Sequence, residues 1–120
     1  MTPIVVWAEI LVSDLAKATD FYEQVFQYET KREVDGPLAM ISFVGDMGIP
    51  SAHLIQGTPA KEGSGAIVHF AIEGSLEDAI ERCKAAGGTV QDGIVDIPPR
   101  RFQYIKDFDG NPLGIFEPRV

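Results

Sequence analysis

The sequence predicts an α+β fold made of two copies of a βαβββ module. The order strand, helix, strand, strand, strand occurs twice along the 120 residues. The two predicted helices begin at Leu15 and Leu76, which are 61 positions apart. Trp7 and His69, in the strands that precede these helices, are 62 positions apart. A period of this length that occurs twice indicates a duplicated module and not a solenoid.

The first module spans residues 4–57. Residues 4–12 are a nearly continuous apolar run with β-branched side chains, which predicts a strand buried on both faces. Asp14 can cap the helix that follows. Apolar residues then recur at three- and four-residue steps, which predicts an amphipathic helix that ends near Gln27 or Tyr28. Three more strands are predicted over residues 29–34, 38–44 and 52–56, with turns at 35–37 and 45–48.

The second module spans residues 66–118 and follows a polar linker over residues 57–65. Ser75 is predicted to cap its helix, and Gly87-Gly88 to end it. Its strands are predicted over residues 66–72, 89–97, 102–108 and 113–116. One module has too little core to fold alone. Residues 1–120 are therefore predicted to form a single domain, in which each module pairs with the other or with a second chain.

Composition narrows the classes of function. The formal net charge of −8 argues against a nucleic-acid partner, because neutralising phosphates needs clustered Lys and Arg, and it favours a cationic ligand. No segment is long and apolar enough to span a membrane, and no basic segment precedes an apolar one as in a signal peptide. We expect a soluble, cytoplasmic protein. The single cysteine, Cys83, cannot form an intramolecular disulfide and is predicted to lie in the core.

Three segments resemble the vicinal-oxygen-chelate superfamily of glyoxalases, bleomycin resistance proteins and extradiol dioxygenases. They are residues 12–15 (VSDL) with Phe21-Tyr22, residues 69–72 (HFAI) with 85–88 (AAGG), and residues 106–112 (KDFDGNP). The resemblance implies curved mixed sheets with helices on the outer face and a cup-shaped site. It also implies a homodimer in which modules of different chains form each cup.

The residues at the family's metal positions depart from its pattern. The resemblance maps these four positions to Trp7, His53, His69 and Gly114, of which only the two histidines can bind a metal. A zinc site normally has at least three protein ligands. We therefore expect no cofactor. The alternative is a divalent metal (Zn, Ni, Fe or Mn) held by His53, His69 and Glu9.

Glu9 is an acidic residue in an otherwise apolar strand. Alternation of side chains places Glu9 on the same face as Trp7 and Leu11. Glu9 is interpreted as a catalytic general base or an anchor for a ligand, and a structural hydrogen bond or salt bridge remains the other interpretation. His53 and His69 are interpreted as a partial metal site or an acid–base pair, or as hydrogen-bonded histidines in a pocket without metal.

Two functions follow from these residues, and the sequence does not decide whether the protein is an enzyme. The first is a small-molecule-binding protein similar to the antibiotic-resistance members of the family, without the complete metal site. The second is a metal-dependent lyase, isomerase or dioxygenase of glyoxalase type. Arg100-Arg101 is interpreted as a solvated basic loop or an anion-binding rim. The candidate ligand-binding residues, which could also be core residues, are Trp7, His53, His69, Phe102, Tyr104 and Phe116.

Overall fold

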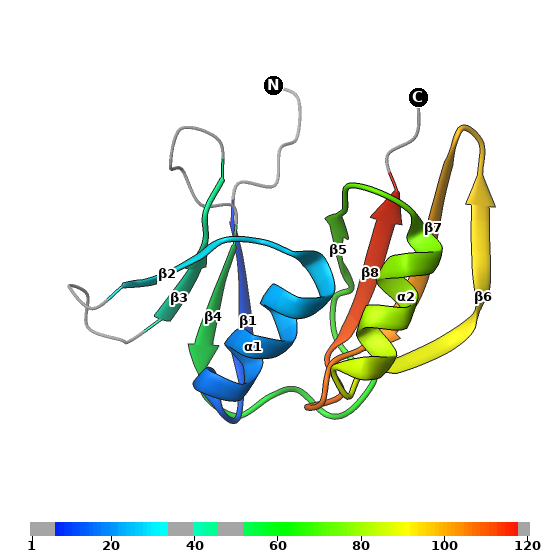
Figure 1. Ribbon diagram of the computed structural model, residues 1–120. Coiled ribbons are helices and arrows are strands. Elements are labelled where there is room, and N and C mark those ends of the chain that lie inside the picture. Colours follow the sequence, from blue (N-terminus) through cyan, green and yellow to red (C-terminus); the bar gives the residue numbers. More distant parts are fainter. Residues whose placement is uncertain (1–6, 34–39, 46–51, 118–120) are drawn as a thin grey trace, which may run out of the picture.

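A computed structural model describes residues 7–33, 40–45 and 52–117. In these residues the chain forms two helices and two four-stranded sheets (Figure 1). The first module contains β1 (Ala8–Val12), α1 (Leu15–Phe26), β2 (Thr30–Glu33), β3 (Met40–Phe43) and β4 (Ala52–Gln56). The second contains β5 (Val68–Ala71), α2 (Leu76–Ala85), β6 (Thr89–Ile97), β7 (Arg100–Lys106) and β8 (Pro112–Glu117).

The two sheets repeat one topology. Their strand orders are β1-β4-β3-β2 and β5-β8-β7-β6. In each sheet the first strand pairs in parallel with the last, and the other neighbours are antiparallel. The α+β fold of two βαβββ modules with mixed sheets is therefore confirmed. The beginning of the strand predicted over 4–12, the turn at 35–37 and most of the turn at 45–48 lie outside the described residues.

The last hairpins differ from the prediction by two residues at each end of β7. Pro98-Pro99 form the turn itself, so β7 begins at Arg100 and not at Phe102. β7 ends at Lys106 because the Asp107 carboxylate accepts hydrogen bonds from the backbone N–H groups of Asp109 and Asn111, both at 2.9 Å. An aspartate that binds the following backbone in this way closes a turn and ends the ladder.

Both helices begin where their capping residues predict. Asp14 accepts a hydrogen bond from the Lys17 N–H at 3.0 Å, and Ser75 accepts one from Asp78 at 3.0 Å. Side-chain oxygens at these positions satisfy N–H groups that have no partner inside the helix. Neither α1 nor α2 has the length and apolar character to cross a membrane. The residues of α1 that are buried lie on one face: Ala18, Phe21, Tyr22, Val25 and Phe26.

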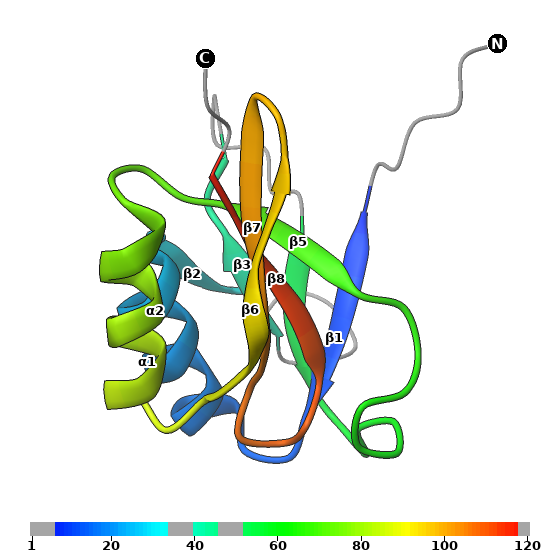
Figure 2. The ribbon, with the colours of Figure 1, turned by 90° about the vertical axis from the view of Figure 1, so that its right-hand side faces the viewer.

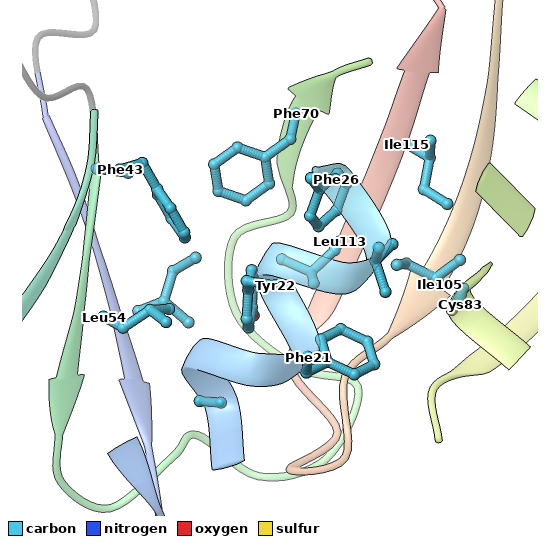
Figure 3. Packing of buried hydrophobic residues seen from close by; sticks show 14 of the residues in the cluster. Phe21, Tyr22, Phe26, Phe43, Leu54, Phe70, Cys83, Ile105, Leu113 and Ile115 are labelled. Carbon is cyan, nitrogen blue, oxygen red and sulfur yellow. The ribbon is translucent and has the colours of Figure 1, made fainter. Parts of the chain in front are cut away.

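An aromatic core joins the two modules. The ring centroids of Phe43 in β3 and Phe70 in β5 are 5.3 Å apart, and both rings contact Tyr22 of α1, at 5.7 and 6.2 Å (Figure 3). Both helices lie on the same side of the strands (Figure 2). Cys83 is fully buried in the same hydrophobic cluster, as predicted. The core-facing sides of the two sheets thus both pack against α1 and this core, and their opposite faces point away from it.

Hydrogen bonds between the closing hairpin and the first module strengthen this contact. The Tyr22 hydroxyl donates to the Asp107 carboxylate at 2.7 Å in a buried position. Asn111 Nδ2 donates to the Leu11 carbonyl at 3.1 Å, and the Ser13 N–H donates to Asp109 at 2.9 Å. Residues of three segments that carry the family resemblance, 12–15, 21–22 and 106–112, therefore contribute hydrogen bonds between the two modules.

Candidate functional site

The first half of the site is a row of polar residues across the first sheet. The register pairs Glu9 of β1 with His53 of β4, and His53 with Ser42 of β3. Directly paired residues have side chains on the same face of a sheet. Alternate positions such as Ile10 and Leu54 belong to the core, so the row lies on the face opposite α1. Glu9 and His53 therefore lie on one face of the first sheet and next to each other.

Trp7 covers His53. The centroids of the two rings are 3.9 Å apart, and their planes are tilted by 44°. The indole Nε1 donates to Glu9 Oε2 at 3.4 Å. His53 is only 3% exposed, whereas Trp7 is 42% exposed. Trp7 therefore lies over His53. The resemblance assigns both residues to metal positions.

Burial has the largest effect on the pKa of His53. It lowers the pKa of the imidazole, and the charges of Glu33 and Glu9 act in the opposite direction. Glu33 itself accepts a hydrogen bond from the Ser42 hydroxyl at 2.8 Å. The Nδ1 atom of His53 is buried and has no hydrogen-bond partner among the residues that the structure describes. Buried polar atoms in native proteins nearly always have a partner, so this atom is a feature that the function has to explain.

Trp7 fluorescence is expected to report the protonation of His53, because the indole lies against the imidazole. Since burial lowers the pKa of His53, the midpoint of the change in emission with pH is expected below 6.5, the usual histidine value. His53→Gln is expected to abolish the transition, and His69→Gln, in the other sheet, to preserve it. A midpoint above 6.5 would show that the neighbouring carboxylates outweigh burial.

The second half of the site lies on the face of the second sheet that points away from the helices and the core. The His69 ring contacts Phe102, Tyr104 and Phe116, with centroid distances of 4.8, 5.8 and 5.8 Å. We call these four residues the His69 cluster. His69 is exposed and Tyr104 and Phe116 are half-buried, so the cluster presents an aromatic surface. Burial lowers the pKa of His69. The structure thus brings together four of the predicted ligand-binding residues.

Gly114 creates the space that the His69 ring occupies. A Cβ atom at Gly114 would lie 2.0 Å from His69 Nδ1. Gly114→Ala is therefore expected to lower the free energy of unfolding by about 1–3 kcal/mol, as overpacked sites do, measured by urea denaturation. In a His69→Ala background the same substitution is expected to cost much less, because the ring is gone. An equal cost in both backgrounds would contradict this explanation.

The two halves of the site do not meet in one chain. Glu9 and His53 lie on the face of the first sheet that points away from the core, and the His69 cluster lies on the corresponding face of the second sheet. Among the described residues, no group of three or more His, Cys, Asp or Glu side chains could hold a metal ion. Glu9, His53 and His69 therefore do not form a joint metal site within one chain.

The donors at the family's metal positions do not fit a divalent ion. The Trp7 indole offers an N–H donor and no lone pair, and it occupies the space above His53. Gly114 has no side chain, and the His69 ring fills the space above it. Two histidines are fewer than the three protein ligands of a typical catalytic zinc site.

Two features of the site region were not predicted. Arg101 forms ion pairs with Glu117 at 3.0 Å and Glu77 at 2.9 Å, so it is neither a solvated loop residue nor an anion-binding rim. The pair with Glu117 depends on the register of β7 and β8, and the pair with Glu77 depends on the packing of α2 against β7. A cavity of about 180 Å³ also lies next to Glu9, between β1, the linker and the last hairpin. Its lining includes Leu11, Ser64, Asn111 and Pro112.

Comparisons with known proteins agree with the architecture. Residues 4–115 match the model of the Glyoxalase/Bleomycin resistance protein/Dioxygenase superfamily. A search of curated protein sequences found no match.

Several solved structures share the fold. One is the genomically encoded fosfomycin resistance protein FosX from Listeria monocytogenes, with a TM-score of 0.74, 21% identity and coverage of 96% of this chain and 91% of that one. A glyoxalase/bleomycin resistance protein/dioxygenase family enzyme from Burkholderia phytofirmans PsJN has a TM-score of 0.70 and 15% identity, with 94% and 97% covered. The hypothetical protein SA1046 from S. aureus has a TM-score of 0.71 and 19% identity, with 92% and 94% covered.

Proposed function

Because this chain belongs to the Glyoxalase/Bleomycin resistance protein/Dioxygenase superfamily, we propose that it binds a small molecule in a cup formed between two copies of the chain. The observation that carries the proposal is that the core-facing sides of both sheets converge on α1, with the Phe43 and Phe70 rings 5.3 Å apart. The candidate site residues are consequently on faces that diverge. A second copy, placed with its second module against the first module of this chain, brings the two halves together.

Exposed apolar side chains support this arrangement. Trp7 is 42% and Leu11 is 44% exposed, and both lie on the face that carries Glu9. Large apolar groups gathered at one surface are typical of ligand or subunit contacts. Opposite them, the His69 cluster of the partner subunit would supply an aromatic wall of the cup.

The residues that line the proposed cup indicate the class of ligand. Aromatic walls with few polar groups suit an apolar or aromatic small molecule, and the net charge of −8 together with the Glu9 carboxylate favours one that is cationic. Trp7, His53, Phe102, Tyr104 and Phe116 line this cup with His69. Glu9 is the charged anchor in a binding protein, or the general base if the protein is an enzyme.

The test combines assembly with ligand and metal binding. Light scattering at micromolar concentration is expected to show a dimer, and metal-free bleomycin is expected to change the fluorescence of Trp7, the single tryptophan. A monomer whose emission does not respond would contradict the proposal.

Metal titration distinguishes small-molecule binding without a metal from the metal-dependent alternative. Zn, Ni, Fe and Mn are titrated against wild type and His69→Ala after purification without chelator. We expect no stoichiometric binding. One metal ion per site, lost in His69→Ala, would instead establish the metal-dependent lyase, isomerase or dioxygenase, in which His53, His69 and Glu9 would hold the ion.

A further inference from the structure

His53 has a buried atom that lacks a partner. Only 3% of the residue is exposed, and its Nδ1 atom is buried and forms no hydrogen bond with residues 7–33, 40–45 or 52–117. His53 is paired in register with Glu9 on one side and Ser42 on the other. The Ser42 hydroxyl does not satisfy it, because that group donates to Glu33. A ligand that supplies the missing partner would complete the hydrogen bonding of this position.

The cover over His53 is held weakly. The bond from Trp7 Nε1 to Glu9 is 3.4 Å long, well beyond the roughly 2.9–3.0 Å of a strong N–H···O bond. Trp7 precedes the first residue of β1 and lies outside the paired register of β1 and β4. Its side chain is 42% exposed. The indole can therefore move away without breaking the sheet.

The position that the indole covers is suited to a positive charge once the indole moves aside. In the part of the chain that the structure describes, Glu9 forms no ion pair with Lys or Arg. The charges of Glu9 and Glu33 both act on His53. The face of an indole also attracts cations. A carboxylate, an imidazole with an unused nitrogen and an aromatic face together match a cation that carries N–H donors.

A metal ion matches these residues less well. The described residues contain no group of three or more His, Cys, Asp or Glu side chains that could hold one. An organic ammonium group needs only the carboxylate, one acceptor and the aromatic face.

We propose that Trp7 is a displaceable cover over a binding position for an organic ammonium group, which Glu9 and His53 would hold through its charge and its N–H donors. The proposal rests on the small-molecule-binding function proposed above and names the part of the ligand that the first module recognises.

Three probes of similar size test the chemistry at constant ionic strength. n-Butylammonium carries a charge and N–H donors, tetramethylammonium carries a charge without N–H donors, and n-butanol is neutral. The readout is the emission of Trp7. n-Butylammonium is expected to give a saturable change, tetramethylammonium a weaker one, and n-butanol none. Equal responses to all three would overturn the proposal, as would no response to n-butylammonium.

Two variants and a control locate the site. Glu9→Gln and His53→Gln are each expected to weaken n-butylammonium binding by about 10- to 100-fold, as expected for loss of a charge-assisted hydrogen bond. Asp20→Asn removes one exposed carboxylate from α1 and is expected to leave the affinity unchanged. Thermal unfolding monitored by circular dichroism checks that each variant is folded. If all three variants bound n-butylammonium equally weakly, the cause would be a general charge effect. That result would overturn the assignment of the site to Glu9 and His53.

The outcomes also separate this proposal from the proposed function. If the Glu9→Gln variant is a dimer that binds bleomycin with unchanged affinity, the ammonium position is disproved, whereas the shared cup is still supported. If the protein is a monomer that binds n-butylammonium through Glu9, the shared cup is disproved, whereas the ammonium position is still supported. A Zn or Ni ion held by Glu9 and His53 would overturn the assignment to an organic cation.

Discussion

Replacing Phe70 by alanine is expected to lower the free energy of unfolding by about 3–5 kcal/mol, the usual cost of deleting a buried phenylalanine. The Phe70 ring contacts Phe26, Tyr28 and Phe43, with centroid distances of 5.0, 5.8 and 5.3 Å. Phe43 belongs to the first sheet and Phe70 to the second, so the cavity would open between the modules. Urea denaturation followed by circular dichroism measures the loss, at one fixed protein concentration in case of dimerisation.

Phe108 provides the matched control. Its ring is half-buried and contacts Phe21 at the edge of the same interface, at 6.2 Å. Phe108→Ala is expected to cost only about 1–2 kcal/mol, because less apolar area returns to water. If both variants lost the same stability, the aromatic core would not be what joins the modules.

Asp107→Ala is expected to cost about 3–5 kcal/mol, because it removes the acceptor from several buried or partly buried donors at once. The Asp107 carboxylate is 3% exposed. It accepts from the Tyr22 hydroxyl at 2.7 Å and from the backbone N–H groups of Asp109 and Asn111 at 2.9 Å. The variant would leave the Tyr22 hydroxyl buried without a partner. Equilibrium unfolding in urea measures the change.

A double-mutant cycle with Tyr22→Phe tests the cause. Tyr22→Phe alone is expected to cost about 1.5–3 kcal/mol, the contribution of one hydrogen bond to a charged group. In the Tyr22→Phe background, Asp107→Ala is expected to cost less than in wild type, since no buried hydroxyl is left unpaired. Strictly additive losses would argue that Asp107 acts only within its own turn.

Local patterns predicted most of the elements. The period-two alternation placed Glu9 and Leu11 on one face, and the burial pattern of β1 confirms this, because both are exposed while Ile10 and Val12 are buried. Capping residues predicted where each helix begins. The start of β7 was missed by two residues, because Pro98-Pro99 could be read as a break as well as a tight turn. The Arg101 ion pairs were not predicted, because the pair with Glu117 depends on the register between β7 and β8 and the pair with Glu77 depends on how α2 packs.

The sequence by itself determined the repeated order of elements and the shared face of Trp7, Glu9 and Leu11, and its family resemblance implied the loss of two metal ligands. These depend on periodicity and on residue chemistry, which are local. Only the tertiary structure decided that Trp7 lies on His53, and that the core-facing sides of the sheets converge on α1 so that the two halves of the site point apart. Those features depend on contacts between residues far apart in the chain, such as Trp7 with His53 and Phe43 with Phe70. No local pattern specifies such contacts, because they are set by how the two modules pack.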